Sequence, residues 1–194
     1  MTLVYIRDSK SRGYIRLGID CEGEVRSYTV SECEYRSLGS PTSRDEISED
    51  AFSAILTYDM KYRARLKALN ILAYGDNSEK TLYMKLKRAG ISSEIAEETV
   101  KEAVSRGYVD SERQIERLIT NEVRLNLRGP MKIIPKLVSK GYSKGEIIRV
   151  MTRLTDEGEI DFEDSKMQLI KKKLPEGASE EEKKKLLYKN GYKV

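Results

Sequence analysis

A repeat of about 50 residues constrains the fold of this chain more than any other feature of the sequence. The stretch 86–92 matches 137–143 at an offset of 51 residues. The same offset relates 96–110 to 147–161, and a third copy lies at 187–192. Repeats of this length are typical of arrays of one supersecondary unit that packs on its neighbours. We therefore expect a mainly α-helical chain of tandem three-helix repeats that form an elongated array.

A small β-hairpin element precedes the predicted repeats. Apolar and polar residues alternate over 13–20 and again over 25–30, with a turn between them. Because a lone hairpin is marginally stable, we expect a further strand near Val4 or a helix to cover it. The predicted domains are the hairpin region with its linker at 1–47, the first three-helix repeat with a lead-in helix at 48–110, the second repeat at 111–160, and a third repeat without its last helix at 161–194.

Capping residues mark the helix ends within the repeats. Gly90 and Gly141 stand where a residue with positive φ would end the second helix of a repeat. Ser92 and Ser143 follow as caps of the third helix. Pro135 fits this scheme poorly, because a proline within a helix removes a backbone hydrogen bond. Either a helix begins at Pro135 or it bends there.

The composition argues against an enzyme and against a membrane protein. The chain has no His, and general acid–base catalysis near neutral pH relies heavily on imidazole. Its two cysteines, Cys21 and Cys33, make a poor zinc site, so we expect no metal and no cofactor; a disulfide between them stays open. No apolar run is long enough for a transmembrane helix, and no signal peptide is visible. We expect a cytoplasmic location.

Basic residues are concentrated in blocks that recur along the chain. Residues 61–90 contain eight basic and two acidic residues, and residues 126–154 contain seven and one. Acidic segments at 91–125 and 155–170 separate the blocks. Such spacing indicates that positive charge is presented repeatedly to a partner that also repeats. The alternative is that each block is an ordinary solvated helix face.

Three segments of the repeats resemble motifs of the RecX family. They are Ser78–Gly90, with Leu82, Lys85 and Leu86 in register, then Gly107-Tyr108-Val109-Asp110, then the stretch from Arg128-Gly129-Pro130 to Lys140-Gly141. The likeness covers about residues 62–194, and its specificity lies in the order and spacing of all three segments. Thr81, Gln114, Ile115, Pro135 and Lys136 depart from the family pattern.

The resemblance implies a regulatory function without catalysis. Proteins of this family bind in the groove of a RecA recombinase filament on DNA, where they typically restrain ATP hydrolysis and strand exchange. The resemblance therefore implies a monomeric modulator of homologous recombination, DNA repair and the SOS response, whose partners are the RecA filament and, by direct contact, single- or double-stranded DNA. Inhibition is the expected direction, although some relatives assist the filament.

We expect basic residues of the two blocks to form the contact surface for RecA or DNA. The candidates are Lys85, Lys87, Arg88, Arg128, Lys132, Lys136, Lys140, Lys144 and Arg149. The competing interpretation is a helix-turn-helix or non-specific DNA-binding protein that acts without a recombinase. The predicted third helices begin with Ser93-Glu94 and Lys144-Gly145-Glu146, which are poorly suited to reading bases.

Overall fold

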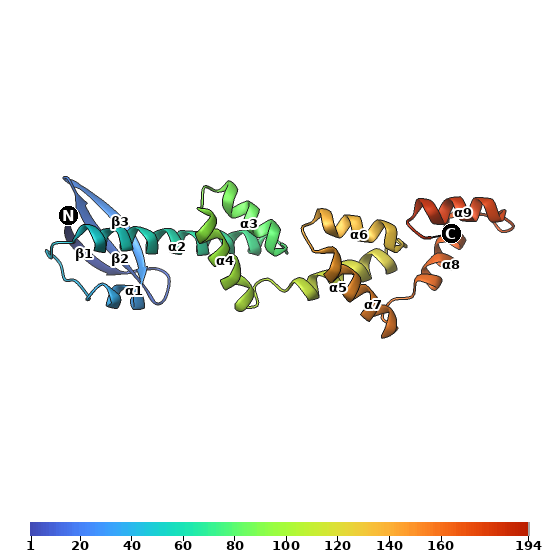
Figure 1. Cartoon of the computed structure of the whole chain (residues 1–194), viewed down its shortest axis with the longest axis horizontal. Helices are drawn as coiled ribbons and strands as arrows, with labels where there is room; N and C mark the ends of the chain where they lie inside the picture. Colours follow the sequence, from blue (N-terminus) through green and yellow to red (C-terminus); the bar gives the residue numbers. More distant parts are fainter. Residues whose placement is uncertain (194) are drawn as a thin grey trace. The chain divides into compact units, whose positions relative to one another are not determined.

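The protein is mostly helical, with one small antiparallel sheet at its N-terminus (Figure 1). The computed structural model describes residues 1–193. The chain divides into two compact units, Met1–Ala73 with Lys85–Lys101, and Tyr74–Met84 with the residues from Glu102 onward. The elements are β1 (Thr2–Asp8), β2 (Tyr14–Cys21), β3 (Glu24–Ser31), α1 (Glu32–Ser37), α2 (Glu49–Ala73), α3 (Glu79–Arg88), α4 (Ser93–Ser105), α5 (Ser111–Arg124), α6 (Pro130–Ser139), α7 (Lys144–Asp156), α8 (Phe162–Lys173) and α9 (Glu180–Lys189).

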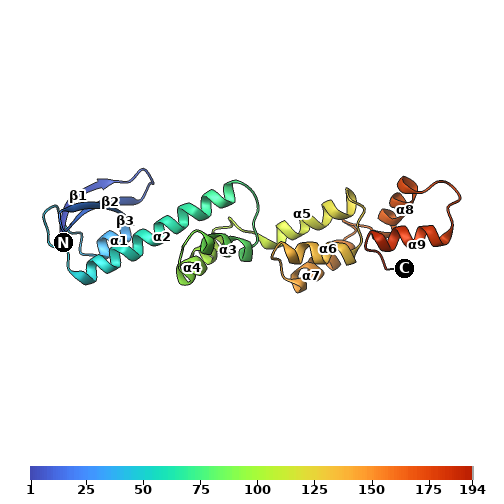
Figure 2. The same ribbon diagram turned by 90° about the horizontal axis from the view of Figure 1, so that it is seen from above.

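The predicted hairpin is confirmed, and a third strand completes its sheet. The strand order is β1-β2-β3, with both neighbouring pairs antiparallel. The covering strand expected near Val4 is β1, and α2 packs on the sheet as well (Figure 2). A buried carboxylate fixes this packing: Asp59 of α2 accepts a hydrogen bond of 2.9 Å from the backbone N–H of Thr29. Ile55 of α2 completes the apolar core beneath the sheet.

The lead-in helix and the first helix of the first repeat form one continuous helix, α2. Ser48 caps its start, since its hydroxyl accepts a hydrogen bond of 3.2 Å from the N–H of Ala51. Along the chain, α2, α3 and α4 correspond to the first predicted repeat, α5, α6 and α7 to the second, and α8 and α9 to the third.

The glycines predicted to end the second helices adopt the left-handed conformation. The φ angles are 84° at Gly90 and 92° at Gly141, which side chains other than glycine rarely adopt. Ser143 caps α7 by accepting a hydrogen bond from the N–H of Glu146. Of the two alternatives for Pro135, a helix start there is wrong. Pro135 lies inside α6, which begins at Pro130, where a missing N–H leaves no bond unmade.

The second repeat is built around a continuous apolar core. Ile115 and Ile119 of α5, Ile133 and Leu137 of α6, and Ile147 of α7 are at most 1% exposed. Each helix turns one apolar stripe inward, so the three helices bury a shared interior and leave their charged faces outward. The basic residues of α6 and α7 therefore lie on helices that this shared core holds together.

Candidate partner-binding surface

Helix α6 and the residues that follow it carry three lysines at four-residue intervals. Lys132 and Lys140 are exposed, whereas Lys136 between them is half-buried. Four-residue spacing keeps side chains on one side of a helix, while Ile133 and Leu137 anchor the other side in the core. The three lysines thus form a row along α6 and its C-cap residue.

Lys136 is committed to an ion pair within the protein. Its Nζ lies 2.5 Å from Oε1 of Glu122, and Nη1 of Arg128 lies 2.8 Å from Oε2 of the same carboxylate. The side chain of Glu122 is only 7% exposed, and Asn126 donates a further hydrogen bond to it. Burial alone would raise the pKa of Glu122, but the hydrogen bond and charge of Lys136, aided by Arg128, outweigh burial and lower it. Lys136 and Arg128, both predicted as contact residues, thus compensate the buried charge of Glu122.

Helix α7 contributes Lys144 and Arg149 to the same unit. Lys144 is exposed at the start of the helix. Arg149 pairs with Glu112 of α5 at 3.1 Å, while Arg153 on the next turn pairs with Glu116 at 2.7 Å. These pairs link α5 to α7 at the surface. Within residues 1–193, Lys132, Lys140 and Lys144 are therefore the candidates of this unit that form no ion pair.

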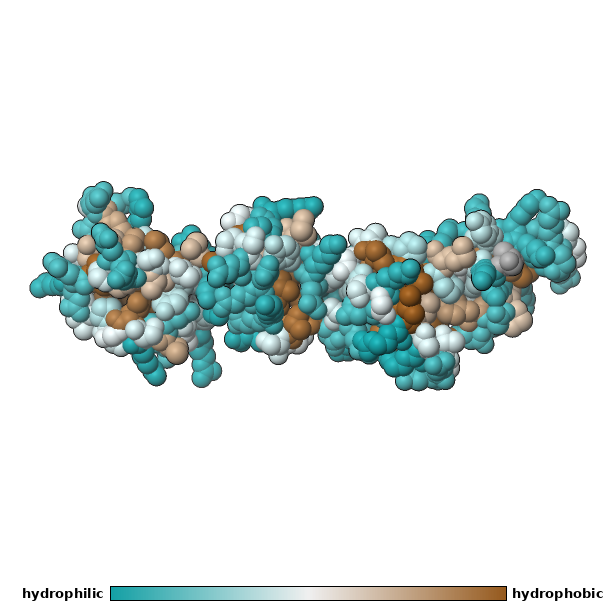
Figure 3. All heavy atoms as spheres, in the orientation of Figure 1, coloured by the Kyte–Doolittle hydropathy of each residue, from teal (hydrophilic) through white to brown (hydrophobic). Residues whose placement is uncertain are grey.

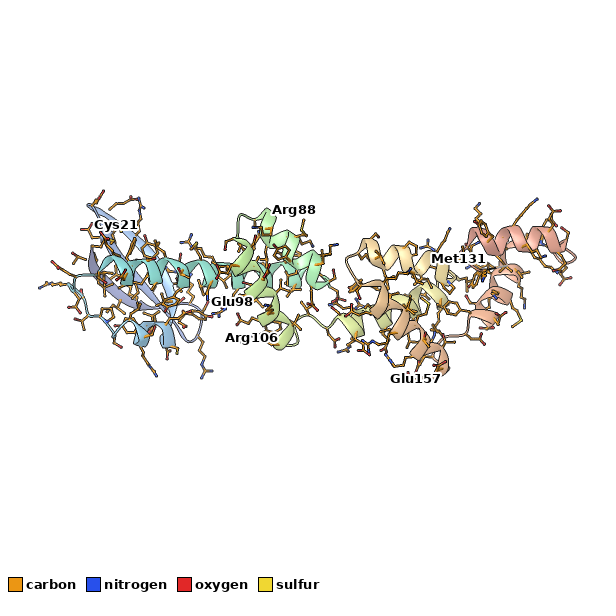
Figure 4. The ribbon with its side chains drawn as sticks, viewed as in Figure 1. Cys21, Arg88, Glu98, Arg106, Met131 and Glu157 are labelled. Carbon is orange, nitrogen blue, oxygen red and sulfur yellow. The ribbon has the colours of Figure 1, made fainter. Side chains whose placement is uncertain are left out.

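The remaining candidates lie in the last turn of α3, in the other compact unit. Lys85 and Arg88 are exposed and Lys87 is half-buried. Figure 4 shows Arg88 at the outer surface of the helix. Cations at a helix C-terminus interact favourably with its carbonyl end, so part of this charge stabilises α3 itself.

Two hydrogen-bonded contacts, here called joints, connect the second helices of successive repeats and were not predicted from the sequence. At the first joint, the hydroxyls of Ser78 and Thr81, at the start of α3, donate hydrogen bonds of 2.8 and 2.9 Å to the backbone carbonyl of Lys140. A Cβ on Gly141 would lie 2.5 Å from Ser78 Oγ. Gly141 is therefore required both by its φ angle and by the close approach of α3.

The second joint repeats this arrangement with backbone donors. The N–H groups of Gly129 and Met131, at the start of α6, donate to the carbonyls of Asn190 and Gly191 at 2.9 and 3.0 Å. Met131 marks this end of α6 in Figure 4. A Cβ on Gly191 would lie 2.7 Å from the backbone nitrogen of Lys132. At both joints, the start of the second helix of one repeat donates hydrogen bonds to backbone carbonyl groups at the end of the second helix of the following repeat.

A buried tyrosine stands beside each joint. Tyr142 donates a hydrogen bond of 2.8 Å to Oε1 of Gln114, and Tyr192 shares one of 2.8 Å with Ser165. Gln114 and Ser165 are separated by the repeat offset of 51 residues. The tyrosine hydroxyl therefore bonds to the equivalent position of the repeat in both cases. Burial raises the pKa of Tyr142. The offset between the two tyrosines was visible in the sequence, but their polar partners were not.

The described residues show neither a metal cluster nor a membrane-spanning helix. Within residues 1–193, no three His, Cys, Asp or Glu side chains converge as a metal site would need. No helix in that range is long and apolar enough to cross a bilayer. Cys21 and Cys33, for which a disulfide stayed open, are both free thiols.

Comparisons with known proteins agree with this architecture. Residues 64–102 match the family model described as "RecX, first three-helix domain". The chain is 33% identical over 149 residues to Regulatory protein RecX of Clostridioides difficile strain 630, covering 75% of this chain and 66% of that protein. It is 26% identical over 125 residues to Regulatory protein RecX of Listeria monocytogenes serotype 4a, covering 64% and 46%. The matched segment thus spans two thirds or less of these relatives.

Solved structures share the same fold. A crystal structure of regulatory protein RecX superposes with a TM-score of 0.72 at 20% identity, covering 99% of this chain and 94% of that one. RecX from Lactobacillus salivarius superposes with a TM-score of 0.58 at 18% identity, covering 70% and 90%.

A small N-terminal sheet followed along the chain by three-helix repeats, with basic residues exposed on their helices, defines a helical-repeat protein. The chain belongs to the RecX family, and its curated relatives bear the name of regulatory proteins.

Proposed function

We propose that this protein docks on a RecA recombinase filament and modulates its ATPase and strand-exchange activity. Inhibition is the expected direction. Membership of the RecX family supports a regulatory function, and the family resemblance points to RecA as the partner. The observation that carries the proposal is the set of exposed lysines without internal ion pairs, Lys132, Lys140 and Lys144, on the rigid core of the second repeat.

The mechanism follows from the position of these lysines. Each exposed ammonium can approach an acidic side chain of the filament or a phosphate of the bound DNA without breaking a contact in the protein. Lys136 and Arg128 hold Glu122 and thereby fix the ends of α5 and α6 relative to each other. A protein that bridges neighbouring recombinase subunits in this way would restrict the inter-subunit movements that ATP turnover requires.

The single-stranded-DNA-dependent ATPase of a bacterial RecA, measured while this protein is titrated in, tests the proposal. We expect a saturable change in rate at or below a stoichiometric ratio to RecA. An unchanged rate, together with retained binding to naked DNA, would replace the proposal with a DNA-binding module that acts without a recombinase. A helix-turn-helix reader would instead prefer one duplex sequence strongly when no recombinase is present.

A further inference from the structure

The first repeat has a pocket at the position where, in the later repeats, the start of a preceding helix contacts the end of the second helix. This pocket has a volume of about 360 Å³ and lies between α2 and the end of α3. Its wall includes Ala89, Gly90 and Ile91. The offset of 51 residues places these three residues on Lys140, Gly141 and Tyr142, which are the residues that receive α3 at the first joint.

The backbone at the pocket already has the conformation of a joint. The φ angle of Gly90 is 84°, compared with 92° at Gly141 and 88° at Gly191. A Cβ added to Gly90 would meet no atom of residues 1–193 within 4 Å, whereas one on Gly141 or Gly191 would collide with the adjoining helix start. The end of α3 therefore has the backbone conformation found at the two joints. In the other two repeats, a preceding helix start contacts the equivalent residues.

The start of α9 is the counterpart of the helix start that fills the first joint. The combined offset of the repeats places Ser179 on Ser78, and both serines are the N-cap residues of second helices. Ser179 Oγ donates to the carboxylate of Glu182 at 2.9 Å, within a capping box of its own helix. Ser78 makes the corresponding donation to the carbonyl of Lys140 instead.

Charge favours the meeting of these two surfaces. The first turn of α9 contains Glu180, Glu181 and Glu182, and the surface there is hydrophilic (Figure 3, right-hand end). The pocket wall includes Arg63 and Lys67. Lys67 is exposed, while Arg63 is held by Asp59 at 2.7 Å. Glu180 and Glu181 also pair with Lys183 and Lys185 of their own helix, so Lys67 is the pocket cation that the glutamates of α9 would meet.

We propose that the pocket at the end of α3 receives the first turn of α9 from a second copy of this chain. The contact would be heterologous, because it joins two different surfaces, and it could continue from copy to copy. Since it involves little more than one helical turn, the affinity would be weak, on the order of 0.1–1 mM. The free protein would then stay monomeric at low concentration.

Sedimentation of the full-length chain at increasing concentration and low salt tests this contact. We expect oligomers with the wild-type chain. Lys67→Glu, which alters only the pocket, and Glu181→Lys, which alters only α9, should each weaken association at least about tenfold, equivalent to about 1.4 kcal/mol. The control Lys101→Glu changes an exposed lysine outside the pocket and should associate like the wild type.

Mixing the two variants decides between this contact and any other. The intact α9 of the Lys67→Glu chain can dock only on the intact pocket of the Glu181→Lys chain. An equimolar mixture should therefore associate more strongly than either variant alone. The proposal fails if the wild type stays monomeric up to millimolar concentration, if the mixture stays monomeric, or if either variant alone associates like the wild type.

Discussion

The first and second repeats share one helical plan but differ at the corner where their second helix ends. In the second repeat, Gly141 touches the start of α3 and Tyr142 is buried against Gln114. In the first repeat, the equivalent residues Gly90 and Ile91 border an open pocket. The helix caps are common to both, so caps define the individual helices. The residues at the end of the second helix differ, and this difference accompanies the presence or absence of a contact with a preceding helix start.

Reversing the charge of Lys136 should have the largest effect on stability in the second repeat. Lys136→Glu removes an ion pair of the buried Glu122 and places a second carboxylate beside it, so we expect a loss of about 3 kcal/mol in the free energy of unfolding. Lys132→Glu, four residues earlier and exposed, should change it by less than about 0.5 kcal/mol. Urea unfolding followed by circular dichroism measures both; equal losses would show that Lys136 has no structural role.

Adding one methyl group to the joint glycines compares the two repeats directly. Gly141→Ala combines an unfavourable φ angle with a collision against Ser78, and should destabilise the protein by about 2–3 kcal/mol. Gly90→Ala meets only the cost of the φ angle, about 1 kcal/mol. Thermal unfolding of the two variants gives the difference. If Gly90→Ala were as costly as Gly141→Ala, the two corners would be equally filled.

Removing the hydroxyl of Tyr142 should have a smaller effect. Tyr142→Phe leaves the side-chain oxygen of Gln114 buried without its donor, at a cost of about 1–2 kcal/mol. The double variant Tyr142→Phe/Gln114→Leu removes both polar groups and should recover part of that loss. A further full loss in the double variant would contradict a specific hydrogen bond between them.

Acidification should produce the smallest difference. The folded-state pKa of Glu122 lies below its ordinary value of 4.5, so its contribution to stability is fully present above that value and is lost as pH falls through the folded pKa. Wild type should therefore lose stability more steeply below pH 4.5 than Glu122→Gln, which has no such proton to bind. Parallel profiles for the two proteins would show that the ion pairs of Glu122 do not stabilise the fold.

The sequence predicted the local elements well because their signals are local. Alternation of apolar and polar residues located β2 and β3, and glycine and serine caps located the ends of α3 and α6 within one or two residues. The commitment of Lys136 to Glu122 could not be predicted, since it depends on how α5 packs against α6. The joints escaped prediction for the same reason, because Ser78 reads as an ordinary N-cap until Lys140 is placed beside it.

Because Lys136 pairs with Glu122, the proposed docking surface reduces to the exposed lysines Lys132, Lys140 and Lys144. Reversal of all four lysines from Lys132 to Lys144 would confound binding with stability, because Lys136 supports the fold. A triple variant that leaves Lys136 intact avoids this difficulty. A matched control reverses three exposed lysines elsewhere, Lys10, Lys101 and Lys193, and so has the same net charge.

The most direct test of the proposed function is the affinity of these proteins for a RecA filament assembled on single-stranded DNA. We predict that Lys132→Glu/Lys140→Glu/Lys144→Glu binds roughly 100-fold more weakly than wild type, while its melting temperature and the affinity of the matched control stay close to wild type. Wild-type affinity in the folded triple variant, or an equal loss in the control, would contradict docking through these three lysines.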